Sequence, residues 1–258
     1  MSFRLVIGVL SLSLTLSLCG QEVVFSRRVY KKQGPSYQQI WSWNPANDVL
    51  LELTHSARDH YLPACKDAGI TFVSSEKLWS FDSASGEERV IGPLPEPPKH
   101  EPKPQNGCAV FAKAGSLEAC GKEEDLSVSR DNKAIVHINI STDPNEQTPI
   151  VSLEWSPDAK WLLVGGLVDL HEGDYFVVNP ATKKLTKVAT AFPNSVLWLP
   201  GRDELLYTTP EYLAPLPGAR RERQVWLQQL IRFEPATGKS TPITSGLGNN
   251  VDAALCSK

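Results

Sequence analysis

The sequence lacks several features that mark common classes of protein. Its 258 residues carry a formal net charge of only −3, so its charge predicts no strong attraction to nucleic acid or to an anionic membrane surface. The only methionine is residue 1, which excludes a methionine-rich, adaptable binding surface. No apolar run reaches the about twenty residues that a transmembrane helix requires. The composition is that of an ordinary globular protein, and we expect no nucleic acid among its partners.

Common motifs of enzymes and metal sites are missing as well. No Gly-x-Ser-x-Gly motif is present, so an α/β-hydrolase nucleophile is unsupported. The Gly-Leu-Gly at 246–248 opens no helix and is no dinucleotide fingerprint. No Cys-x-x-Cys spacing occurs, which disfavours a zinc site. The motifs therefore predict no catalytic residues and no cofactor.

Residues 1–20 have the composition of a secretory signal peptide. Arg4 supplies a positive start, and residues 5–18 are uncharged and mostly apolar. Cleavage after position 19 or 20 would export the chain to the periplasm or out of the cell. Two alternatives remain open. Cys19 could carry the lipid of a bacterial lipoprotein, although a leucine stands where that pattern has a small residue, or the segment could stay as an uncleaved anchor. A lipid on Cys19 would then be the chain's contact with the membrane.

Four further cysteines are an even number in a compartment expected to be oxidising. Cys108 and Cys120 could close a short loop, which would leave Cys65 to reach Cys256 near the end of the chain. In a ring-shaped fold the two ends of the chain meet, so this second bond is geometrically sensible. Three pairings are possible in all, and buried free thiols are the alternative.

A short phrase recurs along the chain. The sequence WSPDAK at 155–160 precedes an apolar run, and weaker versions lie at 43–48, 128–133 and 198–204. A second phrase, Pro-Ala-Thr-x-Lys, occurs at 180–184 and 235–239, with a related version at 81–87. Each predicts strand, tight turn and strand, because proline presets φ and Asp or Asn tolerates turn conformations. Four short strands in about forty residues match the size of one propeller blade.

At these residues the sequence resembles the TolB-like β-propeller repeat proteins, whose blades carry Trp-Ser-Pro-Asp-Gly-Lys and Asp-x-x-Thr-Gly-Lys turns. Ala159 replaces the glycine of the first turn. The resemblance is clear over 151–243, moderate over 37–91 and poor over 93–120. It implies an all-β fold, a β-propeller of about four to six four-stranded blades. The number of blades that the chain can hold leaves three arrangements open: a ring of four or five blades, an irregular or incomplete ring, and a stack of two sheets. Such propellers serve as protein-interaction scaffolds, periplasmic accessory proteins and gating domains of peptidases.

We expect residues 21–258 to form a single propeller-like domain with a proline-rich insertion at 92–107. Six prolines in this stretch favour extended polyproline II structure. It is either a stiff surface excursion or a ligand for a proline-recognising domain. The segment 93–126 is expected to be a degenerate blade or an insertion.

Candidate sites are few. Weak candidates for metal ligands lie in two polar loops, with solvated loops as the alternative: His55, Asp59, His60, Asp169, His171 and Asp174. One basic run after the proline-rich stretch 210–217 is either a solvated loop tip or a docking site for an acidic partner, and its residues are the candidates for a partner-binding loop: Arg220, Arg221 and Arg223.

The sequence thus favours an exported, non-enzymatic propeller that binds another protein or a component of the cell envelope. One alternative is an exported hydrolase or lyase with a site in the central opening, for which Glu154 and Asp203 stand at suitable strand positions. Another alternative is a regulatory propeller of a peptidase system.

Overall fold

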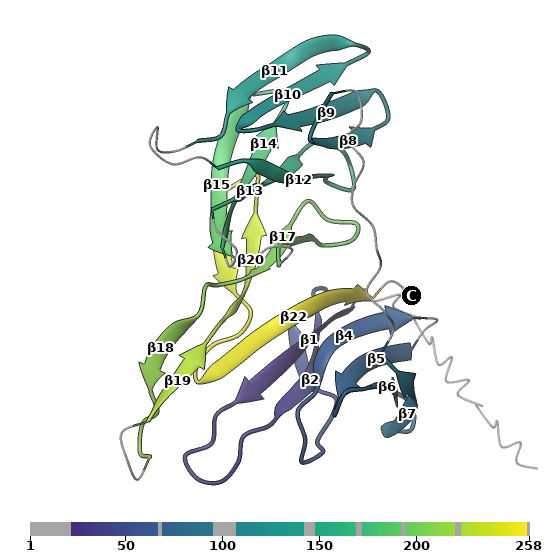
Figure 1. Cartoon of the computed structure of the whole chain (residues 1–258), viewed down its shortest axis with the longest axis vertical. Helices are drawn as coiled ribbons and strands as arrows, with labels where there is room; N and C mark the ends of the chain where they lie inside the picture. The colour runs from purple at the N-terminus through teal and green to yellow at the C-terminus, as the bar shows by residue number, and fades with distance from the viewer. Residues whose placement is uncertain are drawn as a thin grey trace, which may run out of the picture.

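The computed structural model describes residues 22–66, 69–94, 107–141, 148–168, 172–191, 195–219 and 223–256. Antiparallel strands make up the secondary structure of these residues, in five four-stranded sheets and one two-stranded ribbon (Figure 1). No helix of a length and hydropathy suited to crossing a membrane occurs in these ranges. The proposed signal peptide and Cys19 lie outside the described residues.

Each four-stranded sheet is one blade, and the blades are numbered I to V along the chain. Blade I contains β1 (Glu22–Val29), β2 (Gln38–Asn44), β3 (Val49–Glu52) and the last strand, β22 (Gly248–Cys256). Blade II contains β4 (Tyr61–Lys66), β5 (Gly69–Ser74), β6 (Lys77–Asp82) and β7 (Glu87–Pro93). Blade III contains β8 (Val110–Ala114), β9 (Leu117–Lys122), β10 (Asp125–Arg130) and β11 (Lys133–Asn139).

Blade IV contains β12 (Ile150–Trp155), β13 (Leu162–Leu167), β14 (Gly173–Asn179) and β15 (Lys184–Ala191). Blade V contains β16 (Leu197–Trp198), β17 (Leu205–Thr208), β20 (Leu230–Glu234) and β21 (Lys239–Pro242). The ribbon of β18 (Tyr212–Pro215) and β19 (Gln224–Leu227) is inserted between the second and third strands of blade V. The expected all-β architecture of four-stranded blades is confirmed, and the number of blades is five.

The two ends of the described chain meet in blade I. Strand β22 pairs antiparallel with β1, with Glu22 opposite Cys256 at one end and Val29 opposite Gly248 at the other. The first and last strands therefore share one sheet, which is the way propellers hold the two ends of their chain together.

The recurrent turn phrases have a common geometry. In three blades, the backbone N–H of the fifth residue donates to the carbonyl of the first: Gly86 to Asp82, Lys183 to Asn179 and Gly238 to Glu234, each at 2.8 Å. The donor has a φ of 73°, 58° and 72°, respectively, which is the left-handed region. The first residue of two of these turns also accepts backbone N–H groups through its side chain. The repeat seen in the sequence is therefore a repeat of turn structure.

The WSPDAK turn is closed in the same way as its counterpart in blade V. Ser156 N–H donates to the Trp161 carbonyl, and Leu199 N–H donates to the Glu204 carbonyl, both at 2.8 Å. Ala159 has a φ of 58° at the position where the repeat family has glycine. This left-handed conformation explains why glycine is usual there.

Hydrophobic clusters fill the interfaces between blades. One cluster lies between each of four pairs of blades: I and II, I and V, IV and V, and III and IV. None of these clusters combines residues of blades II and III. Figure 1 agrees, because blades II and III lie at the two ends of an open arc. The propeller is irregular and incomplete as a ring, which is one of the arrangements that the sequence left open.

One local expectation needs correction. The segment 93–126 was expected to be a degenerate blade or an insertion, but within it β8 and β9 complete a regular blade III with β10 and β11. The apolar segment 225–233 divides into β19 of the ribbon and β20 of blade V. Most of the proline-rich stretch, 95–106, lies outside the described residues.

Candidate functional site

The β18–β19 ribbon has apolar side chains on both faces. One face packs against the body of the molecule, and the other is exposed to solvent. Val225 and Leu227 of β19 are buried, whereas Trp226 between them is 48% exposed. Leu213 of β18 lies directly opposite Trp226 and is 49% exposed. The buried face packs against residues that flank β1 and β22. Figure 1 shows the ribbon projecting at the lower left of the molecule, so the exposed pair is presented on a protruding element.

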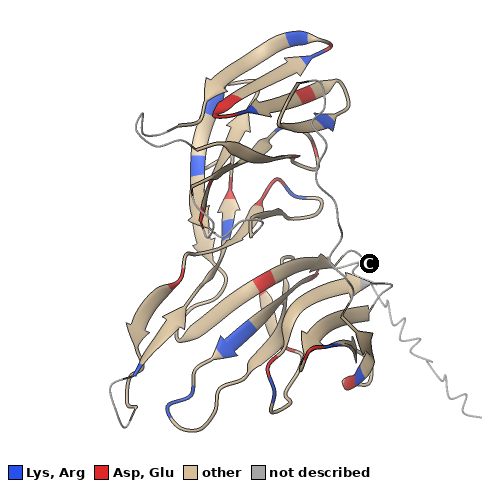
Figure 2. Cartoon of the chain, viewed as in Figure 1, with Lys and Arg blue, Asp and Glu red and all other residues tan. Residues whose placement is uncertain are grey.

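Positive charge gathers beside this ribbon. Arg223 directly precedes β19, and Lys31 and Lys32 lie in the loop that follows β1. The Lys32 side chain lies close to Gly218, in the turn that connects the two strands of the ribbon. Figure 2 shows Lys and Arg positions on β1 and in the loop after it. Glu211 directly precedes β18 and adds one negative charge, so three of these four charges beside the ribbon are positive.

A pocket of about 490 Å³ opens on blade I. Its walls come from β1, β2, β3 and the loops that follow β1 and β3. Its lining includes Arg27, Lys31, Trp41, Glu52 and Ser56. This volume suits a small organic molecule.

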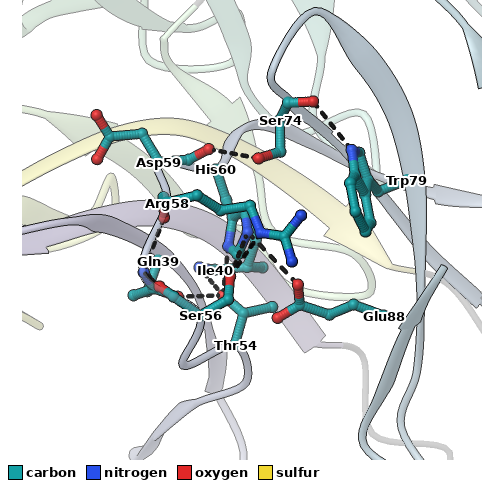
Figure 3. A network of polar contacts seen from close by, with 10 residues as sticks. All are labelled: Gln39, Ile40, Thr54, Ser56, Arg58, Asp59, His60, Ser74, Trp79 and Glu88. Carbon is teal, nitrogen blue, oxygen red and sulfur yellow. Dashed lines mark hydrogen bonds and ion pairs between the residues drawn. The ribbon is translucent and has the colours of Figure 1, made fainter. Parts of the chain in front are cut away.

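A buried polar network stands behind this pocket and includes Ser56 (Figure 3). His60 is completely buried at its centre. The Thr54 hydroxyl donates to Gln39 Oε1 at 2.9 Å and lies 2.8 Å from His60 Nδ1. Because the single Thr54 hydrogen is used on Gln39, His60 Nδ1 must be the donor to Thr54. In a neutral imidazole Nε2 is then an acceptor, and the Ser56 hydroxyl donates to it at 3.0 Å.

The network keeps His60 neutral. Burial, followed by the nearby Arg58 guanidinium, lowers the pKa of His60 to about 4. Arg58 Nε donates to Ser56 Oγ at 3.2 Å, and its guanidinium lies 4.3 Å from the centre of the Trp79 ring. Glu88 Oε2 is buried without a hydrogen-bond partner among the described residues and lies 3.6 Å from His60 Nε2. The arrangement resembles a serine hydroxyl bonded to a general base, but a threonine stands where a carboxylate would orient the imidazole.

The three predicted metal ligands in the loop between β3 and β4 do not point toward a common site. His60 uses both ring nitrogens on hydroxyl groups. Asp59 accepts hydrogen bonds from Arg28 and Tyr61, each at 2.9 Å. His55 is largely exposed, with Nδ1 3.6 Å from a carboxylate oxygen of Glu52.

The second predicted cluster is only partly described. Asp169 and His171 lie outside the described residues. Asp174 is buried and accepts hydrogen bonds from Lys187 at 2.7 Å and Thr190 at 2.6 Å. Among the described residues, no group of three or more His, Cys, Asp or Glu side chains is arranged to hold a metal ion. The metal candidates stay predictions.

The structure pairs Asp203 with Asp158 of the neighbouring blade, rather than with Glu154. Burial and a hydrogen bond to Asp158 raise the pKa of Asp203. Burial opposes ionisation of Asp158, but hydrogen bonds from Lys160, Asp203 and Ser156 hold its pKa well below the usual range. Burial raises the pKa of Glu154 as well. The carboxylate pair thus joins the turns of blades IV and V and is neutralised in part by Lys160.

The cysteines form two disulfides in the structure. Cys65 of β4 is bonded to Cys256 of β22, and Cys108 is bonded to Cys120 of β9. The Cα atoms are 5.2 Å and 5.4 Å apart, respectively, within the usual range for disulfides. Disulfides are typical of proteins in oxidising compartments.

Of the predicted partner-binding arginines, only Arg223 is described, because Arg220 and Arg221 lie outside the described residues. The sequence did not single out Trp226, Leu213 or the blade I pocket. Residues 225–227 are Val-Trp-Leu, all apolar, so the sequence shows no alternation that would have signalled the ribbon.

Comparison with known proteins gives structural matches only. No family model and no curated protein matches the sequence. Among solved structures, TolB from Acinetobacter baumannii is 12% identical with a TM-score of 0.48, over 91% of this chain and 66% of the TolB chain. A protein from Agrobacterium tumefaciens with a provisional TolB assignment is 7% identical with a TM-score of 0.40, over 88% of this chain and 90% of the other.

An oligogalacturonate lyase in complex with manganese is 9% identical with a TM-score of 0.31, over 80% of this chain and 70% of the lyase. This chain thus spans slightly less than two thirds of the Acinetobacter TolB chain. Likeness at these identities and TM-scores carries no argument about function. The assignment of a propeller fold rests on the five blades and their turns.

Proposed function

We propose that this chain is an exported, non-enzymatic propeller that binds another protein through its β18–β19 ribbon. The observation that carries the proposal is the Leu213–Trp226 pair, two large apolar side chains opposite each other that are about half exposed. Tryptophan is among the residues that contribute most to protein interfaces. The pair stands on a two-stranded ribbon whose other face is already buried, so its position is fixed before a partner binds.

The charges near the ribbon specify the partner further. Lys32 lies beside the turn of the ribbon and Arg223 directly precedes β19, and neither forms an ion pair with a described residue, whereas Glu211 directly precedes β18. A partner surface with an apolar side chain ringed by carboxylates would complement both features. We therefore assign the partner as a protein with an acidic patch, either free in the exported compartment or part of the cell envelope.

The test compares two pairs of exposed apolar residues. The first variant replaces Leu213 and Trp226 by serine. The matched control replaces Val49 and Leu51 of β3, which are 51% and 55% exposed, by serine. Each mature protein is immobilised and incubated with an envelope extract from its own source, and the recovered proteins are quantified by mass spectrometry. Surface changes of this kind leave folding stability nearly unchanged, which thermal unfolding verifies.

We expect the wild type and the β3 control to retain the same partner. The ribbon variant should bind this partner at least about 30-fold more weakly, since truncation of a central aromatic costs about 2 kcal/mol or more. The proposal fails if the ribbon variant retains the partner as well as the control does, or if no partner is enriched over a blank matrix.

Export is a separate part of the proposal, and the two disulfides support it. Mass spectrometry of the intact protein from its own cells tests it directly. A mass that begins at residue 20 or 21 without lipid supports cleavage of a secretory signal, and a lipid on Cys19 supports a lipoprotein. A mass that begins at residue 1 in the cytoplasmic fraction argues against export.

A second candidate function, hydrolysis through a serine nucleophile, is favoured by one observation. Ser56 lines the blade I pocket, and its hydroxyl donates to the neutral His60 imidazole at 3.0 Å. The lowered pKa of His60 makes the imidazole a weak base, which favours the binding function instead. Labelling with a fluorophosphonate probe decides between them. Labelling that the Ser56→Ala variant abolishes supports the hydrolase, and unlabelled wild-type protein excludes it.

A further inference from the structure

Arg27 is the unusual residue of the blade I pocket. Its guanidinium carbon lies 4.8 Å from the centre of the Trp41 ring, and one terminal nitrogen donates to the Ser245 carbonyl at 3.3 Å. These contacts hold the guanidinium at the pocket wall. The Arg27 side chain is thus positioned by the fold and does not sample solvent freely.

The charge of Arg27 is poorly compensated. No carboxylate oxygen of a described residue lies within 4 Å of its guanidinium. Burial lowers the pKa of Arg27, and the more distant Glu52 counteracts this only in part. Arg27 Nε and Trp41 Nε1 are buried donors without an acceptor among the described residues. Buried charges in proteins are normally paired, so a partly buried guanidinium without a carboxylate beside a pocket indicates a missing anion.

The other walls restrict the charge of this anion. Lys31 at the pocket forms no ion pair with a described residue and adds positive charge. Glu52 adds negative charge to the same wall, in contact with His55. Glu52 repels a doubly charged anion more strongly than a singly charged one, and a single carboxylate can accept a bidentate hydrogen bond from a guanidinium. The volume of about 490 Å³ leaves room for a molecule around the carboxylate.

We propose that the blade I pocket binds the carboxylate group of a small organic monoanion, with Arg27 as the principal ligand-binding residue and Lys31 as a second positive group. The carboxylate could belong to an acidic sugar or to an amino-acid derivative, and the recognised chemistry is the same. This site is independent of the ribbon and of the protein partner proposed for it.

The polar network behind the pocket supports this role. Gln39 donates to the Ser56 and Arg58 carbonyls at 2.9 Å and 3.1 Å, and its own carbonyl accepts from Thr54. These bonds tie the loop after β3 to β2 and fix the Ser56 wall of the pocket. The pocket is therefore preorganised, which reduces the entropy cost of binding a small ligand.

Isothermal titration calorimetry on the full, disulfide-bonded protein tests the site with two matched pairs of probes. Methyl glucuronoside is compared with methyl glucoside, and N-acetylglycine with N-acetylglycinamide. Inorganic phosphate is the fifth probe. Variants are Arg27→Gln, Lys31→Gln and the control Arg89→Gln, which removes an exposed arginine of blade II.

We expect at least one acid to bind while its neutral counterpart does not. Arg27→Gln should weaken binding at least about tenfold, because a hydrogen bond to a charged group contributes about 1.5–3 kcal/mol. Lys31→Gln should weaken it by a smaller factor, and Arg89→Gln should leave it unchanged. Binding of the glucuronoside alone identifies an acidic sugar, and binding of N-acetylglycine alone identifies an amino-acid derivative.

Three results would overturn the proposal: equal binding of acid and neutral probe, tighter binding of phosphate than of either acid, and no binding of any acid. Arg27 also packs on Trp41, so near-ultraviolet circular dichroism checks that the Arg27→Gln variant is folded. If that variant is unfolded, Lys31→Gln decides the question, because Lys31 lies in an exposed loop. Unchanged affinity in Lys31→Gln, together with no effect of salt on binding, then counts against the site.

Discussion

The disulfide between Cys65 and Cys256 should contribute more to stability than the disulfide between Cys108 and Cys120. The first joins β4 of blade II to the end of β22 in blade I, across 191 residues of sequence. The second closes a loop of 12 residues within blade III. A cross-link limits the freedom of the unfolded chain, and this effect grows with the logarithm of the loop length.

The loop lengths give the expected magnitudes. Closure of the long loop corresponds to about 5 kcal/mol and closure of the short loop to about 3 kcal/mol at 25 °C. The difference of about 2 kcal/mol between the two variants is more reliable than either value. Both variants lose one pair of sulfur atoms, so the effects of that loss largely cancel in the difference. Alanine is the suitable replacement because Cys256 and Cys108 are buried, and a serine hydroxyl there would need a partner.

Urea unfolding of the wild type and of the two double alanine variants measures these values. Tryptophan fluorescence and far-ultraviolet circular dichroism are followed together, because coincident transitions justify a two-state free energy of unfolding. We expect both variants to have a lower free energy of unfolding than the wild type, and the Cys65→Ala/Cys256→Ala variant to have the lowest. If loss of the short-loop disulfide costs as much as loss of the long-loop disulfide or more, the loop-entropy reasoning is refuted.

Three further predictions concern single positions. The pKa of His60 falls from 6.5 to about 4 on folding, so the unfolded state binds the proton more tightly and about 3 kcal/mol of stability should be lost as the pH falls from about 7 to about 4. Urea unfolding across this range should show a smaller loss of stability for His60→Gln than for the wild type, and an equal loss would contradict the reasoning. Gly173→Ala should lower the free energy of unfolding by about 1–3 kcal/mol, since its new Cβ would lie 2.8 Å from a backbone carbonyl oxygen of β13. Gly92→Ala, with nothing within 4 Å of the new Cβ, is the control and should be nearly neutral. Glu76→Gly should raise the melting temperature, because Glu76 has a φ of 60°, where a side chain is strained, and an unchanged or lower value would contradict this.

Local turn chemistry explains how much of the fold could be predicted from the sequence. The phrases at 155–160, 179–183 and 234–238 determine their own hydrogen bonds within a few residues, so they are visible without tertiary structure. The four-strand period of the blades follows from their spacing. Blade III was harder to predict because its strands use small side chains. Ala119 and Gly121 of β9 are buried, yet neither has the hydrophobic bulk that usually marks a buried strand.

Tertiary pairing accounts for what the sequence did not predict. Strand β22 contains two asparagines and an aspartate, and its place beside β1 follows only from the meeting of the two chain ends. The pocket is formed by side chains from three strands and two loops. These residues are not regularly spaced in the sequence, so no sequence motif predicts the pocket. His60 lies in a polar stretch that looks solvated, but strands β2 and β5 bury it beside Phe72. Candidate sites of this kind become visible only when the blades are assembled.

Charged side chains on the outer faces of the terminal blades disfavour closure of the arc. The face of blade III that points away from blade IV contains the ion pair between Lys113 and Glu118, next to a cross-strand row of Phe111, Cys120, Ser127 and His137. The corresponding face of blade II contains the exposed ion pair between Arg89 and Glu87.

Closing the ring would bury these faces against each other. Both charged pairs would then lose their hydration, and the desolvation of an ion pair can exceed the attraction within it. Repeat proteins solve the same problem by giving their terminal repeats a polar outer surface. Blades II and III carry such charged pairs on their outer faces, beside the apolar Leu78 and Phe111, whereas the facing sides of the packed blades carry apolar clusters. The charged pairs of the two end blades therefore oppose closure of the ring, and the Cys65–Cys256 disulfide links blades I and II at one end of the arc.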